Sequence, residues 1–124
     1  MARSFRELEV WKSGRKLKIR ISELVRKFPK SEDYSLTSQI RNSSRSITAC
    51  IAEGHGRFHF QENIQFCRVS RGSLDETLDH LITALDENYI TEEELKECEA
   101  LYETTIKLLN GYINYLKNQK DKDL

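Results

Sequence analysis

The sequence is poor in the residues that break helices and in those that crosslink small proteins. Its 124 residues include one proline, five glycines and three cysteines. The odd number and wide spacing of Cys50, Cys67 and Cys98 predict reduced thiols within helices, in a reducing compartment. No apolar run approaches the roughly 18 residues of a membrane span, and the N-terminus has no apolar leader. We therefore expect a soluble, cytoplasmic protein with a single domain over residues 1–124.

Net charge is absent as well. The 20 Lys and Arg residues balance 20 Asp and Glu residues, which excludes a globally basic nucleic-acid-binding protein. The distribution is uneven, because residues 1–30 carry ten basic and three acidic side chains, a charge of +7. Residues 61–90 carry −4 and residues 91–124 carry −3. Such asymmetry bears on the partners of a protein rather than on its fold.

What the sequence does contain is the periodicity of amphipathic helices. Apolar residues recur at alternating spacings of four and three, the pattern of a bundle seam. We expect helices over residues 6–28, 34–55, 60–88 and 92–117, and no strand. Short connections then predict an all-α, up-down-up-down antiparallel four-helix bundle. The first helix places on its seam Val10, Gly14, Leu17, Ile21, Leu24 and Phe28. The third helix carries one cation, Arg71, on an otherwise apolar seam.

The fourth helix has a well-marked start and two apolar stripes. Thr91 and Glu94 have the spacing of a capping box. One stripe consists of Leu95, Cys98, Tyr102, Ile106, Leu109, Ile113 and Leu116. The other consists of Leu101, Thr105, Leu108, Tyr112 and Tyr115. One stripe is enough for an intramolecular core, so the second predicts burial against another copy of the chain.

The segment 39–76 reads as two helices folded back on each other about a turn near Phe58. Gly54 is a candidate for the left-handed position that ends a helix. Antiparallel pairing predicts that Ser43 and Ser44 face Gly72 and Ser73, so that the two backbones approach closely. The same pairing predicts an ion pair between Arg41 and Glu76. Glu53 is expected to pair with Arg57 or to accept from neighbouring backbone donors.

Signs of chemistry are scarce. His55 and His59 have metal-ligand spacing, but the predicted turn interrupts the helix and no third ligand lies nearby, so surface histidines are favoured. The segment Gly54-His55-Gly56 lacks the strand and the Lys-Ser/Thr pair of a phosphate-binding loop. No catalytic triad can be assigned from spacing. We expect no enzyme activity, cofactor or metal.

The basic face of the first helix is the best functional clue. Phosphate contacts need cations on one surface, and this helix supplies Lys12, Arg15, Lys16, Arg20 and Lys27. Two other interpretations stay open: a solvated polar face, or a surface that complements the acidic third and fourth helices. The first hypothesis is a non-enzymatic oligomer that binds RNA or DNA through these residues. The alternative is an assembly or adaptor module for a protein partner, without nucleic acid.

Several short motifs resemble one known family, the 23S ribosomal RNA intervening-sequence proteins. They are Leu8-Glu9-Val10-Trp11, Phe28-Pro29, Gln39-Ile40-Arg41, Ser46-Ile47, Ile51-Ala52-Glu53-Gly54, Gly56-Arg57 and Gly72-Ser73-Leu74 with Glu76. Together they cover nearly the whole chain. The sequence departs from the family pattern at Asn42, where a second basic residue is common.

The resemblance implies a four-helix protein encoded within bacterial large-subunit ribosomal RNA genes or elsewhere in bacterial genomes. Members of this family resemble the accessory variability proteins of diversity-generating retroelements, which are pentameric barrels that bind nucleic acid and a reverse transcriptase. By this resemblance we expect a homo-pentameric ring. The second apolar stripe of the fourth helix agrees with oligomerisation, although not with any particular number of copies.

Overall fold

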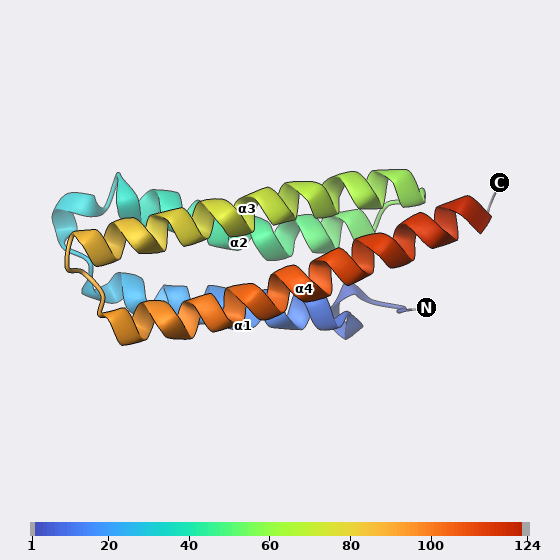
Figure 1. Cartoon of the computed structure of the whole chain (residues 1–124). Coiled ribbons are helices and arrows are strands. Elements are labelled where there is room, and N and C mark those ends of the chain that lie inside the picture. The colour runs from blue at the N-terminus through green and yellow to red at the C-terminus, as the bar shows by residue number, and fades with distance from the viewer. Residues whose placement is uncertain (1, 123–124) are drawn as a thin grey trace.

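The computed structural model describes residues 2–122, and these residues form helices without any strand. Four long helices lie side by side and alternate in direction, with both ends of the described chain at the same end of the bundle (Figure 1). Their bounds are α1 Glu9–Leu24, α2 Leu36–His55, α3 Phe60–Asp86 and α4 Glu92–Lys122. Short 3-10 turns occur at η1 Phe5–Glu7, η2 Val25–Lys27 and η3 Lys30–Glu32. The all-helical bundle expected from periodicity is therefore present.

The first helix is shorter than the expected residues 6–28. Ser4 accepts from backbone N–H groups and pairs with Glu7 in a capping box, which closes η1 as a separate turn. Leu8 is extended, so α1 begins only after it. At the other end the backbone tightens into η2, and Phe28 is extended before Pro29, as the proline ring demands. The fourth helix is longer than expected, because it continues to Lys122 rather than ending near residue 117.

The predicted seams form the core. The five seam residues within α1 are buried, and the sixth, Phe28 just beyond η2, is 8% exposed. Along α3, Ile64, Cys67, Leu74 and Leu81 are each at most 1% exposed. Arg71, the exception on that seam, reaches sideways, and its Nη1 donates to Asn110 Oδ1 of α4 at 2.8 Å. The cation thus lies at the edge of the core, where its head stays near solvent.

Hydroxyl groups fill the contact between α2 and α3. Ser70 donates to the carbonyl oxygen of Ile47 at 2.7 Å. Thr77 hydrogen-bonds Ser43 at 2.8 Å, and Ser73 donates to Ser46 at 2.9 Å. We call these five side chains the hydroxyl seam: Ser43, Ser46, Ser70, Ser73 and Thr77. The expected pairing of Ser43 and Ser44 with Gly72 and Ser73 was therefore wrong by about one helical turn.

Gly54 and Gly72 of this hairpin both differ from expectation. Gly54 is not in a left-handed conformation, since no described glycine has a positive φ. It is buried inside α2, where an added Cβ would lie 2.7 Å from Asn63 Oδ1 and 2.9 Å from Phe66 Cβ of α3. Gly72 is exposed, and an added Cβ would meet nothing within 4 Å. The close approach of the two helices therefore occurs at Gly54, beside the turn.

The charged residues of the hairpin also differ from expectation. No ion pair joins Arg41 to Glu76 in the described part of the chain; both are exposed, and Glu76 Oε2 lies 3.1 Å from His80 Nε2 instead. The shifted register explains this, because it moves Glu76 away from the level of Arg41. The local pair between Glu53 and Arg57 is confirmed at 3.3 Å.

The fourth helix begins as predicted. Glu94 N–H donates to Thr91 Oγ1 at 3.1 Å, and Thr91 N–H donates to Glu94 Oε1 at 2.9 Å, which completes the capping box. Its second apolar stripe is only partly free: Thr105 is buried and hydrogen-bonds Ser13 of α1 at 2.6 Å. Leu101 and Leu108 pack half-buried against the core. None of the described helices is long and apolar enough to cross a membrane.

The two hairpin glycines give a matched test of this packing. Gly54→Ala should lower the free energy of unfolding by about 1–3 kcal/mol, because the new methyl group overlaps Asn63 and Phe66. Gly72→Ala should raise it by about 0.5–1 kcal/mol, since alanine fits the open space and favours the helix. Urea denaturation followed by circular dichroism measures both. Equal effects of the two substitutions would contradict the assignment of the close contact to Gly54.

Candidate nucleic-acid interface

The structure divides the predicted basic face of α1 into two parts. Toward its C-terminal end, Arg20 and Lys27 turn to the start of α4. Arg20 Nε donates to Glu97 Oε2 at 2.9 Å, and Lys27 Nζ donates to Glu94 Oε2 at 2.7 Å. The hydrogen bond that Arg20 donates to Glu97 raises the pKa of Arg20, and the hydrogen bond that Glu94 accepts from Lys27 lowers the pKa of Glu94. These two cations thus complement acids of the same chain, one of the alternatives left open by the sequence.

The N-terminal part of the face remains available. Lys12, Arg15 and Lys16 are all exposed. Lys12 Nζ lies 3.3 Å from Glu9 Oε1 on the same helix, an exposed pair that contributes little. The Arg15 guanidinium lies 5.9 Å from the centre of the Trp11 ring, a cation–π contact that does not neutralise its charge. Lys16 has no carboxylate within 4.0 Å among residues 2–122.

Charge is segregated along the whole bundle. Cross-helix hydrogen bonds from Lys18 to Thr48, Ser13 to Thr105 and Ser73 to Ser46 lie near its middle. On one side is the terminal half, which we define as residues 2–17, 47–72 and 105–122. On the other side is the loop half, residues 18–46 and 73–104. The terminal half carries twelve Lys/Arg and five Asp/Glu, a charge of +7, whereas the loop half carries eight and fourteen, a charge of −6.

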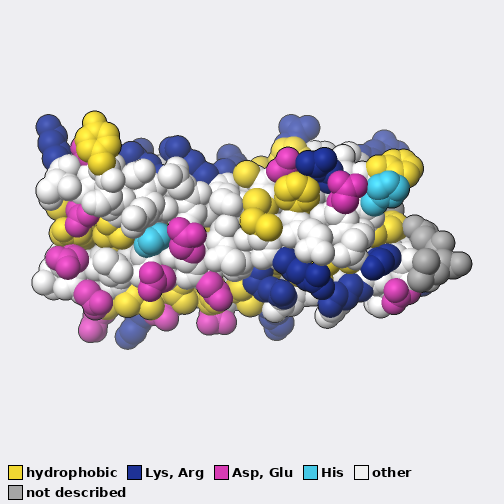
Figure 2. All heavy atoms as spheres, turned by 90° about the horizontal axis from the view of Figure 1, so that it is seen from above, with side chains coloured by type: hydrophobic (Ala, Val, Ile, Leu, Met, Phe, Trp, Pro, Cys, Tyr) yellow, Lys and Arg dark blue, Asp and Glu magenta, His cyan; other side chains and the backbone are white. Residues whose placement is uncertain are grey.

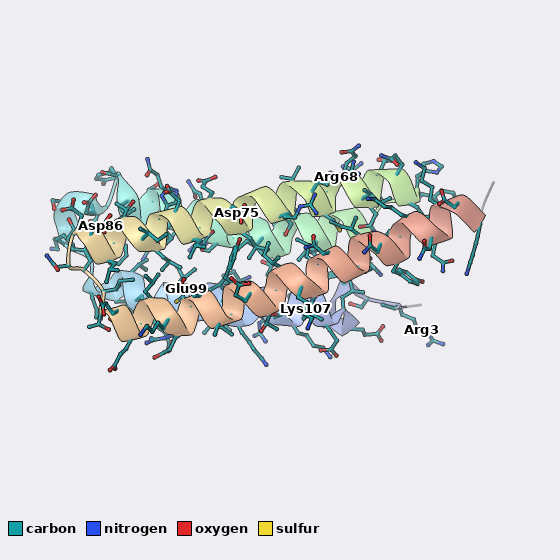
Figure 3. All side chains as sticks on the ribbon, viewed as in Figure 1. Arg3, Arg68, Asp75, Asp86, Glu99 and Lys107 are labelled. Atoms are coloured by element: carbon teal, nitrogen blue, oxygen red, sulfur yellow. The ribbon has the colours of Figure 1, made fainter. Side chains whose placement is uncertain are left out.

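The figures show this segregation on the α3 and α4 side. In Figure 3, Arg3, Arg68 and Lys107 lie toward the end that holds both chain ends, whereas Asp75, Asp86 and Glu99 lie toward the other. The space-filling view shows the same trend along its lower edge, with acidic side chains gathered on the left and Lys and Arg on the right (Figure 2). The acidic and basic groups thus lie mainly in different halves of the bundle, so each half presents a net charge of its own sign.

The sequence did not indicate that α3 and α4 contribute cations to the terminal half. The exposed cations there include Arg68, Lys107, Lys117 and Lys120. None of them lies within 4.0 Å of a carboxylate in the described part of the chain. Lys120 Nζ donates to Gln61 Oε1 at 2.6 Å, which ties the end of α4 to the start of α3. In the sequence, the cation Arg71 on the α3 seam was the only sign of these residues. The register of α3 against α4 is needed to bring the cations of the two helices together.

The other predicted residues have structural surroundings. Gly54 and Ser73 belong to the α2–α3 contact, and Glu53 pairs with Arg57, which also lies 3.8 Å from Glu62. His55 Nε2 lies 3.1 Å from the carbonyl oxygen of Ala2, while His59 is the N-cap residue of α3. No group of three His, Cys, Asp or Glu side chains in residues 2–122 could hold a metal ion. Cys67 and Cys98 are buried, and desolvation raises their thiol pKa to about 12 and about 11.

Comparisons with known proteins give a family and a fold. The family model described as 23S rRNA-intervening sequence protein matches residues 6–111. A similar solved structure is that of a protein with unknown function from the S23 ribosomal protein family of Bacteroides thetaiotaomicron VPI-5482. It is 23% identical with a TM-score of 0.77, and the match covers 84% of this chain and 97% of that chain. At this identity the likeness shows the fold alone. No curated protein matches the chain.

The acid–base contact between α1 and α4 predicts a pH-dependent effect on stability. Glu94→Gln keeps an oxygen for the capping box but removes the charge that faces Lys27 and Arg20. At neutral pH we expect the free energy of unfolding to fall by up to about 1 kcal/mol. Urea denaturation of Glu93→Gln, an exposed neighbour in the same helical turn, is the control.

The sign with pH follows from the lowered pKa of Glu94. Its carboxylate stabilises the folded state at pH values above the unfolded pKa of 4.5, and this contribution is lost as pH falls through the lower folded value. The difference between Glu94→Gln and the unchanged protein should therefore shrink as the pH falls below 4.5, and should vanish once Glu94 is protonated in the folded state as well. A difference that persists undiminished in acid would show that the charge pair is not its cause.

Proposed function

The chain belongs to the family of 23S rRNA-intervening sequence proteins, and from this premise we propose that it is a non-enzymatic cytoplasmic protein that binds RNA or DNA through its terminal half. The observation that carries the proposal is the +7 charge of this half, where exposed cations on three helices lack carboxylate partners among the described residues. Phosphate binding needs such cations on a shared surface, because each contact releases condensed counterions from the nucleic acid. The balanced total charge is no obstacle, since the acidic groups lie mainly in the other half.

The proposal refines the basic face expected from the sequence. Lys12, Arg15 and Lys16 stay within it, whereas Arg20 and Lys27 are assigned to the contact with α4. Arg68, Lys107 and Lys117 are added. The interface is therefore expected to cross α1, α4 and α3 at the terminal half, rather than to follow α1 along its length.

We further propose that the chain assembles as a homo-oligomer, a pentameric ring by its family resemblance. Apolar side chains left on the outer helix surfaces support association: Ile19 is 46% exposed, Val69 55% and Ile82 43%. In a ring, the basic halves of several copies would act together on one nucleic acid. Light scattering should return about 73 kDa, five times the 14.6 kDa chain. A monomer at micromolar concentration would contradict the assembly.

Charge reversal tests the nucleic-acid interface. A triple variant with Arg68→Glu, Lys107→Glu and Lys117→Glu should weaken binding to a structured RNA at low salt. The slope of log K against log salt should also fall by roughly 2–3. The control is a triple variant of exposed cations in the loop half, Arg26→Glu, Lys30→Glu and Arg41→Glu, which changes the net charge equally. A third variant, Lys12→Glu with Lys16→Glu, measures the share of α1.

Equal losses in the two triple variants would show that only net charge matters, and absence of binding at low salt would refute the proposal. That second outcome favours the alternative function, an adaptor for a protein partner without nucleic acid. The specific observation in its favour is two aromatic rings in open solvent, Tyr34 at 100% and Phe58 at 93% exposure.

A further inference from the structure

A cavity lies at the tip of the terminal half, where segments far apart in the sequence meet. It is formed by the N-terminal segment, the turn between α2 and α3, the start of α3 and the last turns of α4, which converge at one end of the bundle (Figure 1). Its volume is about 340 Å³. This size lies at the lower end of the range of roughly 300–1,000 Å³ typical of small-ligand sites. The cavity can therefore hold a group of one or two rings.

Its walls are mainly aromatic. Phe58, Phe60, Tyr112 and Tyr115 all line it. The Tyr112 and Tyr115 rings are nearly parallel, with centroids 6.3 Å apart and an interplanar angle of 13°. Tyr115 is 41% exposed and Phe58 is 93% exposed, so two ring faces remain uncovered. Such faces offer stacking surfaces to a flat, aromatic ligand.

Polar side chains in the cavity can distinguish ligands by their hydrogen-bonding groups. Asn63 is 7% exposed, and its Nδ2 donates to the Tyr112 hydroxyl oxygen at 3.1 Å. Because that oxygen accepts, the Tyr112 O–H remains able to donate. Burial raises the pKa of Tyr112, so this proton is retained at neutral pH. Asn63 Nδ2 carries a second N–H as well. Two lining side chains, Asn63 and Tyr112, therefore retain donor groups that can serve a ligand edge.

The rim is positively charged. Lys117 follows the lining residue Leu116, and Lys120 is held by Gln61, next to the lining residue Phe60. Arg57 also lines the cavity, but Glu53 and Glu62 lie 3.3 Å and 3.8 Å from it, so its charge is already shared. Lys117 and Lys120 do not line the cavity, but they adjoin lining residues and have no carboxylate within 4.0 Å among the described residues, so they can receive an anion beside a ring in the cavity.

We infer that this cavity takes an unstacked nucleobase from a single-stranded stretch of RNA or DNA, with the adjoining phosphate at Lys117 and Lys120. The inference rests on the proposed function and narrows it from nucleic acid in general to single strands, loops or ends. A duplex hides the faces of its bases, whereas an unpaired base can stack on aromatic side chains and expose its edge to donors. The aromatic side chains suit the face of a base, the hydrogen-bond donors suit its edge, and the lysines suit the adjoining phosphate.

The test uses the full-length protein and an oligoadenylate roughly 12 nucleotides long, within the site sizes of single-strand binders. Phe58→Ala and Tyr115→Ala should each weaken binding about 5- to 100-fold, the usual effect of losing one stacking ring. The salt dependence should stay unchanged, because phosphate contacts are kept. Tyr34→Ala, a fully exposed aromatic in the loop half, is the matched control and should change nothing. An oligonucleotide with abasic sites should bind the unchanged protein as weakly as the intact one binds the variants.

The outcomes separate this inference from the proposed function. If the abasic strand binds as tightly as the intact one, or the two cavity variants lose nothing, the cavity is not a base site, while phosphate binding by the terminal half stands. If no strand binds at low salt, the proposed function fails, and adenosine monophosphate then tests the cavity alone. Shifts of the Phe58 and Tyr115 ring signals in its NMR titration would support a nucleobase site, and their absence would overturn it. Monophosphate binding as tight as that of the strand would contradict the assignment to nucleic acid.

Discussion

The contact between α2 and α3 is the constraint on which the rest of the molecule depends. Five hydroxyl-bearing side chains meet there, and the Ser70 hydroxyl donates to the carbonyl oxygen of Ile47 in the middle of α2. A buried hydroxyl that loses its hydrogen-bond partner lowers the stability of the fold by about 1–3 kcal/mol. A shift of α3 by one turn along α2 would leave several hydroxyls without partners at once. Ile47 also borders α1, because a Cβ on Gly14 would lie 3.2 Å from its Cγ2. The hydroxyl seam thus fixes the register of three helices.

That register places the charges. It brings Arg68 and Arg71 of α3 to the level of the C-terminal part of α2, and the contact of Arg71 with Asn110 brings the basic end of α4 beside them. At the opposite end, acids of α4 lie against Arg20 of α1 and Lys27 of η2. A chain without net charge thereby acquires two halves of opposite sign. Fixed helices hold this separation, so the long-range field does not depend on flexible segments.

The elements of the fold could be predicted from the sequence, because periodicity reports which face of each helix is buried. The burial of Val10, Leu17 and Ile21 follows from their spacing alone, and the Thr91–Glu94 capping box depends only on residues close in sequence. The register of the hairpin could not be predicted by counting from Phe58. Gly54 in turn was expected to end a helix, whereas it lies within α2 and packs against Asn63. The neighbouring sequence cannot distinguish a glycine that ends a helix from one that lets a second helix pack closely.

The candidate site was less accessible from sequence for the same reason. The basic face of α1 was visible, but its division depends on where Glu94 and Glu97 lie in space. The cavity at the tip combines Ala2, Phe58 and Tyr115, which no spacing rule connects.

The proposed binding of nucleic acid by the terminal half, which the hydroxyl seam positions, can be measured from the changes in backbone amide chemical shifts during titration with oligoadenylate. The shift changes should concentrate in residues 2–17, 47–72 and 105–122, and should be largest around Phe58 and Tyr115. Shifts spread along all of α1, or centred on the acidic residues 73–104, would contradict it.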